Sequence, residues 1–107
     1  MEDPDRKARL AAALGAGQKH IAQCPLYLIW LVDLARLGRV AEERQLGLQG
    51  LEYLEPFIVG IVDAALAAQN AAIALESLGL GFVYIGAMRN RPEEVAAELE
   101  LPPHVMA

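Results

Sequence analysis

A short run of small residues offers the clearest possibility for chemistry in this chain. It comprises Tyr84, Ile85, Gly86 and Ala87, with Arg89 close behind. Glycine and alanine leave the backbone uncovered, so its N–H groups could reach a flat heterocycle, and Arg89 could supply positive charge. Strand ends beside helix starts collect ligands in α/β architectures. An ordinary strand-to-helix connection explains the same residues, and both interpretations stay open.

A second segment with glycines, Gly15 to Gln18, is less specific. Gln18 could donate a hydrogen bond to a ligand. The segment lacks the strand, glycine loop and helix that a dinucleotide or phosphate loop requires, so we interpret it first as a helix end. Gly79 to Gly81 is interpreted in the same way, as the end of a second helix.

Metal and nucleophile chemistry receive little support. His20 and Cys24 stand four residues apart and could share a helical face, but His104 is the one further soft ligand, so a zinc set is incomplete. We predict no metal site. Cys24 adjoins an apolar run and is expected to be an inert buried thiol. Glu93 and Glu94 are expected to be solvated helix-start acids, and no catalytic side chain is identified.

Local signals predict an α+β chain that is mainly helical. Asp3 followed by Pro4 starts a helix, and Pro92 starts another with acids in its first turn. The expected helices span residues 4–14, a short turn at 18–23, a long helix from 51–56 to Leu78, and 92–100.

Two short buried strands are expected, Leu26 to Val32 and Phe82 to Ile85. The first is apolar on both faces, which implies cover on both faces. Residues 34–49 are polar and rich in glycine, with a weak helical pattern at 40–48. We expect no element after His104.

Composition limits the classes of function. The chain has 107 residues, enough for one domain with a modest core. Its formal net charge is -5 without a Lys/Arg cluster, which excludes binding of nucleic acid through phosphate neutralisation. A lone cysteine forms no internal disulfide and suits a reducing compartment. The first ten residues lack the apolar core of a signal peptide, so we expect a cytoplasmic protein.

The long helix is nearly all apolar. Phe57 to Leu75 approaches the length of a membrane span, but Asp63, Gln69 and Asn70 interrupt it at a depth where lipid disfavours them. We interpret it as the core helix of a soluble protein with no membrane partner. Hydrophobic residues make up 55% of the chain, more than so small a domain can bury. We therefore expect at least a dimer, formed through this helix.

The long helix and the turn after it resemble one protein family. A helix with the pattern D…QN…ESLGLG, followed by YIG..RN, is similar to the oxygen-insensitive NADPH nitroreductase and flavin reductase family, FMN-dependent nitroreductases of the NADPH-preferring group. Residues 38–53 match the family poorly. The matching segments are AGQKHIAQ (Ala16 to Gln23), GIVDAALAAQNAAIALESLGLG (Gly60 to Gly81), VYIGAMRN (Val83 to Asn90) and LPPHV (Leu101 to Val105).

The resemblance implies a nitroreductase-like core and an FMN-dependent NAD(P)H oxidoreductase. In that family FMN lies across a homodimer interface and is reduced by a nicotinamide. The reduced flavin then passes electrons to a small-molecule acceptor such as a nitroaromatic, a quinone or free flavin.

The resemblance also implies which residues contact the flavin. Gln18 matches a glutamine that contacts the flavin, and His20 lies in the same segment. Tyr84 to Ala87 match the turn that runs along the isoalloxazine ring. Ala87 stands where the family usually has a second glycine, and its methyl group could narrow the site. The implied positions are Gln18, His20, Tyr84, Ile85, Gly86, Ala87 and Arg89.

Two basic segments of the family have no counterpart here. Family members hold the FMN phosphate with a His-Arg-Ser-type segment near the N-terminus, and they continue past the position of Val105 into a strand and a basic segment. We therefore expect residues 1–107 to form a single truncated domain that binds FMN weakly or not at all. A non-catalytic helical dimerisation or interaction module is the alternative, and a second chain that supplies the missing segments is a third possibility.

Overall fold

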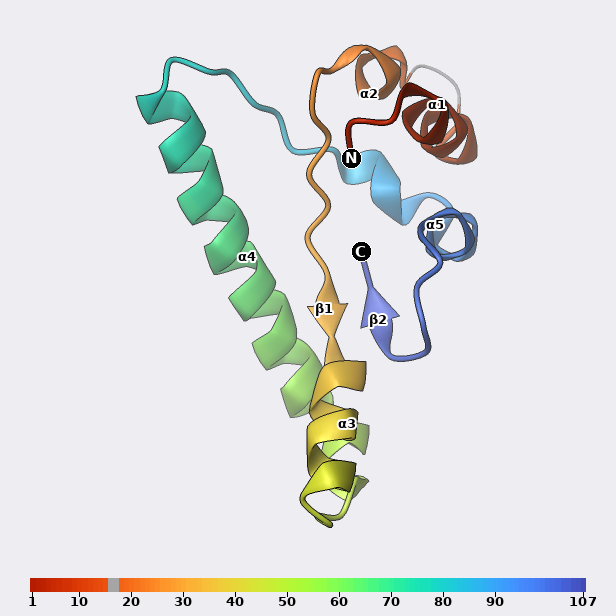
Figure 1. Cartoon of the computed structure of the whole chain (residues 1–107), viewed down its shortest axis with the longest axis vertical. Helices are drawn as coiled ribbons and strands as arrows, with labels where there is room; N and C mark the ends of the chain where they lie inside the picture. Colours follow the sequence, from red (N-terminus) through yellow and green to blue (C-terminus); the bar gives the residue numbers. More distant parts are fainter. Residues whose placement is uncertain (16–17) are drawn as a thin grey trace. The chain divides into compact units, whose positions relative to one another are not determined.

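The computed structural model describes residues 1–15 and 18–107, and the chain divides into two compact units (Figure 1). The first unit contains Met1–Ile29, Tyr84–Leu101 and Ala107, and the second contains Trp30–Val83 and Pro102–Met106. Of the predicted segment Gly15 to Gln18, Ala16 and Gly17 lie outside the described residues. All seven flavin-contact positions implied by the resemblance lie in the first unit.

Local signals account for the helices of the first unit. The Asp3 carboxylate accepts hydrogen bonds from the backbone N–H groups of Asp5 (2.8 Å) and Arg6 (3.1 Å), as a helix N-cap does. Gly15, with a φ of 96°, ends the same helix in a left-handed conformation that favours glycine. The elements are α1 (Pro4–Ala13), α2 (Lys19–Gln23), the 3₁₀ turn η2 (Gly86–Arg89) and α5 (Pro92–Leu99).

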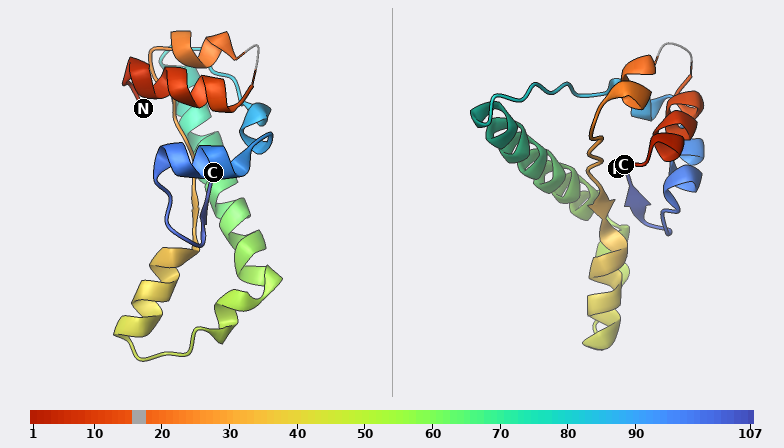
Figure 2. Two further views of the ribbon diagram at one scale, coloured as in Figure 1. Left: turned by 90° about the vertical axis from the view of Figure 1, so that its right-hand side faces the viewer. Right: turned by 45° about the horizontal axis from the view of Figure 1, so that its top comes forward.

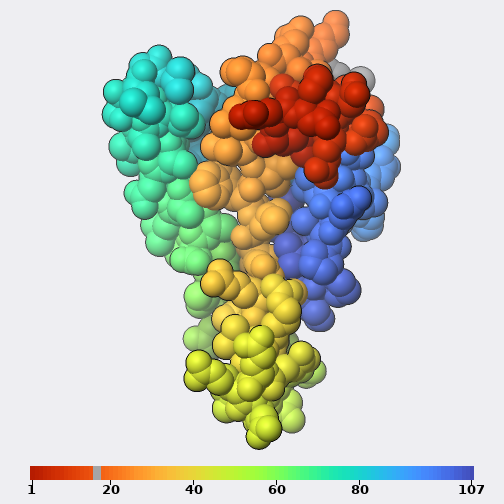
Figure 3. All heavy atoms as spheres, viewed as in Figure 1, coloured from red at the N-terminus to blue at the C-terminus, as the bar shows by residue number. Residues whose placement is uncertain are grey.

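A small apolar core holds the first unit together. Its buried members come from α1, α2, the segment after α2, and α5: they are Leu10, Leu14, Ile21, Tyr27 and Val95. In Figure 3 the atoms of α1 lie against those of residues 18–29 and of the segment that contains α5. Residues distant in the sequence are thus fixed around one cluster.

The second unit is a pair of helices with a minimal sheet. Asp33 and Val105 pair in the antiparallel ladder of β1 and β2, as do Val32 and Met106. Figure 2 shows α3 leaving β1 and α4 returning past it. The elements are β1 (Val32–Asp33), α3 (Leu34–Glu43), the 3₁₀ turn η1 (Gln49–Glu52), α4 (Leu54–Ser77) and β2 (Val105–Met106).

The long helix α4 confirms the predicted element, but this chain covers only one side of it. A stripe of small residues repeats every four positions from Gly60 to Ala72; Gly60 lies against Val32, and Ala68 and Ala72 are buried. Val62 and Leu66, on the other side, are more than half exposed. By length and composition alone, α4 is the one helix in the described part of the chain that could cross a membrane.

The first predicted strand is wrong in extent. Of Leu26 to Val32, only Val32 enters the sheet, because β2 offers a partner of just two residues. The prediction that both faces would be covered is also wrong for this chain. Tyr27 and Val32 are buried, whereas Leu26, Leu28, Trp30 and Leu31 remain exposed.

The second predicted strand, Phe82 to Ile85, is also wrong. These residues belong to no sheet in the described part of the chain, since a β-strand requires a neighbouring backbone in register. The second strand is instead β2, where no element was expected. The prediction of two short strands in a mainly helical α+β chain holds, but one of them lies elsewhere.

The helix after β1 starts earlier than predicted. The pattern indicated weak helix at residues 40–48, whereas α3 runs from Leu34 to Glu43. Its start follows from Asp33, whose carboxylate accepts a hydrogen bond from Arg36 N at 2.9 Å and caps the helix.

Candidate functional site

The turn η2 packs its apolar side chains on the core of the first unit, with Gly86 and Arg89 at the surface. Ile85, Ala87 and Met88 pack against the core of the first unit, whereas Gly86 and Arg89 are exposed. Ile85 is still extended, with φ −103° and ψ 98°, and the 3₁₀ turn begins at the next residue. The apolar contacts therefore hold the turn from beneath and leave its outer surface open to solvent.

The backbone N–H groups of Gly86 and Ala87 are available to a ligand. Both residues stand at the start of η2, where a 3₁₀ helix has no acceptor of its own for them. Among the described residues, neither N–H donates a hydrogen bond. Two neighbouring donors on an uncovered turn suit the edge of a heterocycle that carries carbonyl and imine acceptors.

Arg89 places a positive charge directly over this turn. A β-carbon built on Gly86 would stand 3.1 Å from Nη2 of Arg89 and 3.6 Å from Nη1, so the guanidinium lies against the glycine backbone. No carboxylate forms an ion pair with Arg89 in the part of the chain described. The guanidinium of Arg89 and the N–H groups of Gly86 and Ala87 therefore lie together in this turn.

The other predicted contact residues lie in the segment that leads into α2. Gln18 is half-buried at the N-terminus of α2, and His20 is exposed. Ile21 next to them is fully buried in the same core on which Ile85 packs. The fold therefore attaches both predicted segments to one core. Within the described residues, no hydrogen bond or ion pair joins Gln18 or His20 to residues 85–89. Tyr84 is 56% exposed at the start of the turn.

Asn90 was not predicted as a site residue, yet its hydrogen bonds connect the turn η2 to the end of α1. Its side-chain Nδ2 donates a hydrogen bond to the carbonyl of Leu14 at 3.2 Å, and its backbone N donates to the carbonyl of Ala87 at 2.9 Å. Leu14 is the C-cap of α1, immediately before Gly15. The RN pair in the family-like motif contains Asn90, but its partner lies 76 residues away, so local patterns give no sign of the bond.

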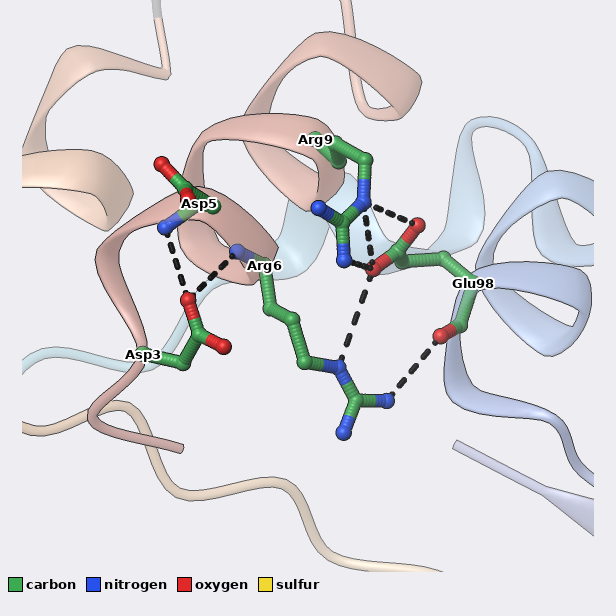
Figure 4. Close-up of polar contacts among 5 residues, drawn as sticks. All are labelled: Asp3, Asp5, Arg6, Arg9 and Glu98. Carbon is green, nitrogen blue, oxygen red and sulfur yellow. Dashed lines mark hydrogen bonds and ion pairs between the residues drawn. The ribbon is translucent and has the colours of Figure 1, made fainter.

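Two arginines of α1 are engaged by one glutamate of α5 (Figure 4). Arg9 Nε donates to both carboxylate oxygens of Glu98, at 3.1 and 3.0 Å, and Arg6 Nη2 donates to the Glu98 backbone carbonyl at 3.1 Å. The hydrogen bonds from Arg9 hold the pKa of Glu98 below its usual value. The pKa of Asp3 is also lowered, chiefly by the N–H of Arg6. These cations stabilise the packing of α1 on α5.

Cys24 lies beside a buried lysine that sequence patterns did not reveal. The Cys24 thiol is half-buried and donates to the carbonyl of Ile21 at 3.1 Å. Lys7 is 5% exposed, and its ammonium donates to the carbonyl of Cys24. Burial raises the pKa of the neighbouring Tyr27. The helical spacing of Lys7 with Leu10 and Leu14 was the signal that could have placed this lysine inwards.

The residues that would hold the ring of FMN are in the turn: the backbone N–H groups of Gly86 and Ala87 and the guanidinium of Arg89 are donors for a planar ring with several acceptors. Gln18 offers a further amide on the other segment. Lys19 and Arg89 are exposed cations of these two segments that could face a phosphate, and His20 is an exposed imidazole beside Lys19. Among the described residues, no group of three or more His, Cys, Asp or Glu side chains is placed to hold a metal ion.

Comparison with known proteins gives one consistent result. The family model described as "Nitroreductase family" matches residues 2–107. The chain is 44% identical over 103 residues to an oxygen-insensitive NADPH nitroreductase of Salmonella typhimurium, covering 95% of this chain and 41% of that protein. It is 39% identical over 107 residues to an FMN reductase (NADPH) of Bacillus subtilis, covering 99% of this chain and 43% of that protein.

Solved structures agree with these relatives. The chain superimposes on NfrA1 of B. megaterium with a TM-score of 0.93 at 41% identity, and on the NfrA1 nitroreductase of B. subtilis with 0.92 at 38%. Each match covers 99% of this chain and 43% of the solved chain. The chain thus spans about two fifths of the length of the relatives it matches.

Proposed function

The chain belongs to the nitroreductase family, and we propose that it acts in an NAD(P)H-dependent flavin oxidoreductase, in which it provides contacts for FMN. Bound FMN would supply the redox chemistry, taking a hydride from the nicotinamide and passing electrons to a small-molecule acceptor. The names of the relatives, NADPH nitroreductase and FMN reductase, support this class of reaction.

The observation that carries the proposal is the uncovered pair of amides at Gly86 and Ala87 with the guanidinium of Arg89 against them. Donors fixed before a ligand arrives cost no reorganisation when negative charge accumulates on it. The amides orient the edge of the ring, and Arg89 favours the negative charge that a flavin gains on reduction. The apolar anchoring of Ile85 and Ala87 keeps these donors in place.

Gln18 and His20 contribute from the second segment. The side-chain amide of Gln18 binds the flavin, and His20 lies in the same contact segment. Tyr84 completes the set at the start of the turn. The resemblance of AGQKHIAQ and VYIGAMRN to flavin-contacting segments supports these assignments, together with the attachment of Ile21 and Ile85 to one core.

A second copy of the chain covers the outer face of α4. Val59, Val62, Leu66 and Ile73 lie on this face and are each more than half exposed. Contiguous apolar surface of this kind marks an interaction site in soluble proteins. Asp63 and Asn70 border the face, and their desolvation in lipid would be costly, which favours protein over membrane as the cover.

Titration of the purified chain with FMN, followed by NADPH oxidation in the presence of a quinone, tests the proposed function. We expect a saturable shift of the flavin absorbance bands and NADPH oxidation faster than with free FMN alone. Unchanged bands, together with oxidation at the rate of free FMN, would contradict it.

A non-catalytic helical dimerisation module is the second candidate, favoured by the exposed face of α4. A stable dimer that leaves the FMN bands unchanged would support this module over the flavin enzyme. Co-purification of another chain that restores flavin binding would instead show that a partner contributes contacts to the flavin.

A further inference from the structure

Asn90 connects the turn that we propose contacts the flavin to the end of α1. Its backbone N–H closes η2 by donating to the Ala87 carbonyl at 2.9 Å, and its side-chain amide reaches the Leu14 carbonyl at 3.2 Å. Arg91, the next residue, is the N-cap of α5. One residue therefore joins the turn, the end of α1 and the start of α5.

The Leu14 carbonyl needs a donor from outside its own helix. It belongs to the last carbonyls of α1, which have no N–H partner within the helix. Leu14 is 1% exposed, so little water reaches the residue, and an unpaired carbonyl in such a place is unfavourable. The side chain of Asn90 satisfies this carbonyl and simultaneously fixes its own position.

Apolar packing keeps the turn against the core, and a hydrogen bond adds a directional restraint. Ile85, Ala87 and Met88 contact the core through interactions that have no direction of their own. A hydrogen bond restricts both distance and angle. The N–H groups of Gly86 and Ala87 must keep their positions to within a fraction of an ångström to orient a ligand. The turn therefore requires a directional restraint such as a hydrogen bond.

We infer that Asn90 is a positioning residue that holds the turn Ile85–Arg89 against the end of α1 through its hydrogen bond to Leu14, and so sets the affinity of the chain for FMN. The inference rests on the proposed function, because it concerns the same contacts. Asn90 itself acts through the turn and is not assigned a contact with the flavin.

Asn90→Asp is the sharpest test. The substitution keeps the shape of the side chain but replaces the donor by a carboxylate oxygen that repels the Leu14 carbonyl. A carboxylate two residues before Pro92 also favours the N-terminus of α5, which limits the loss of stability. Gln49→Glu in η1 is the matched control, because it makes the same change from amide to carboxylate at an exposed residue of the second unit.

Amide hydrogen exchange of the flavin-free chain gives the first readout. We expect faster exchange in Asn90→Asp both at Leu14 and Gly15 and at Ile85–Arg89, with the interior of α1 unchanged and with no effect of Gln49→Glu. Unchanged exchange at either segment would overturn the inference. An equal rise throughout α1 would also overturn it, because Asn90 would then act on global stability alone.

FMN titration by fluorescence quenching gives the second readout. We expect Asn90→Asp to weaken binding about five- to tenfold, the effect of losing one directional hydrogen bond. Unchanged affinity, beside saturable binding by the unsubstituted chain, would contradict the positioning role. Failure of the unsubstituted chain to bind FMN would contradict the proposed function instead, while hydrogen exchange would still decide whether Asn90 ties the two segments.

Discussion

Gly60 of α4 and Val32 of β1 are in such close contact that no β-carbon fits between them. A β-carbon built on Gly60 would stand 2.6 Å from Cγ1 of Val32. Val32 is buried, paired with Met106 in the sheet and restricted at χ1 as a β-branched residue, so it cannot easily move aside. This contact fixes where the long helix crosses the strand.

Gly60→Ala is expected to destabilise the second unit by about 1–3 kcal/mol, the usual effect of overpacking. Gly38→Ala is the matched control within α3, because its β-carbon would meet Leu51 Cδ1 at an ordinary 3.8 Å. That control should stabilise by about 0.5–1 kcal/mol, the helix propensity difference. Urea denaturation followed by circular dichroism measures both. Equal effects of the two substitutions would refute the close contact.

Gly86→Ala is expected to weaken FMN binding by about tenfold, because a methyl group would cover the two amide donors. The fold should survive, since the new β-carbon meets only the flexible end of Arg89. Gly81→Ala is the control, because its β-carbon has nothing within 4 Å. Fluorescence titration gives the affinities. If both variants bind FMN as the unsubstituted chain does, the turn is not the ligand surface.

Glu98→Gln should reduce the dependence of stability on pH. Arg9 holds the pKa of Glu98 below its usual value of 4.5, so the ionised form is favoured in the folded state. Its stabilisation is therefore complete above pH 4.5 and is lost as pH falls through the lowered pKa of the folded chain.

Thermal unfolding at pH 7 and pH 3 should show Glu98→Gln melting below the unsubstituted chain at pH 7, with the gap narrowing at pH 3. Asp3, whose pKa is lowered too, keeps some acid sensitivity in both proteins. Glu42→Gln, at an exposed residue of α3, is the control and should leave the profile unchanged. A gap that persists at pH 3 would show that packing, not charge, is what Glu98 provides.

Leu66→Arg should convert the proposed dimer to a monomer. The residue is 61% exposed on the outer face of α4, so an arginine causes no clash within the chain but leaves a charge buried in the contact between copies. Gln49→Arg adds the same charge at an exposed position of η1 and should remain dimeric. Light scattering gives the masses. A monodisperse monomer before any substitution would count against the dimer.

Sequence patterns predicted those elements that local residues determine. Asp3 and Pro92 identified helix starts, and the apolar run ending at Leu78 identified α4 nearly to its ends. The strand predictions were wrong because a strand forms only beside a partner strand. Leu26 to Val32 has strand composition, yet β2 pairs with only one residue of it, Val32.

The candidate site divides in the same way. The uncovered turn at Gly86 and Ala87 follows from residue types, and so does the charge of Arg89. Three interactions depend on tertiary packing: the hydrogen bonds from Asn90 to Leu14 and from Lys7 to Cys24, and the ion pairs of Glu98 with two arginines. No spacing within the sequence encodes the partners of these bonds.

Chemical-shift mapping of the chain with FMN tests the central claim most directly. Amide resonances are recorded as FMN is added, with riboflavin in parallel to separate ring from phosphate contacts. We predict saturable shifts concentrated at Gln18, His20 and the turn from Tyr84 to Arg89, and largely shared by riboflavin. Shifts confined to other parts of the chain, or none at millimolar flavin, would contradict the assignment of this surface to the flavin.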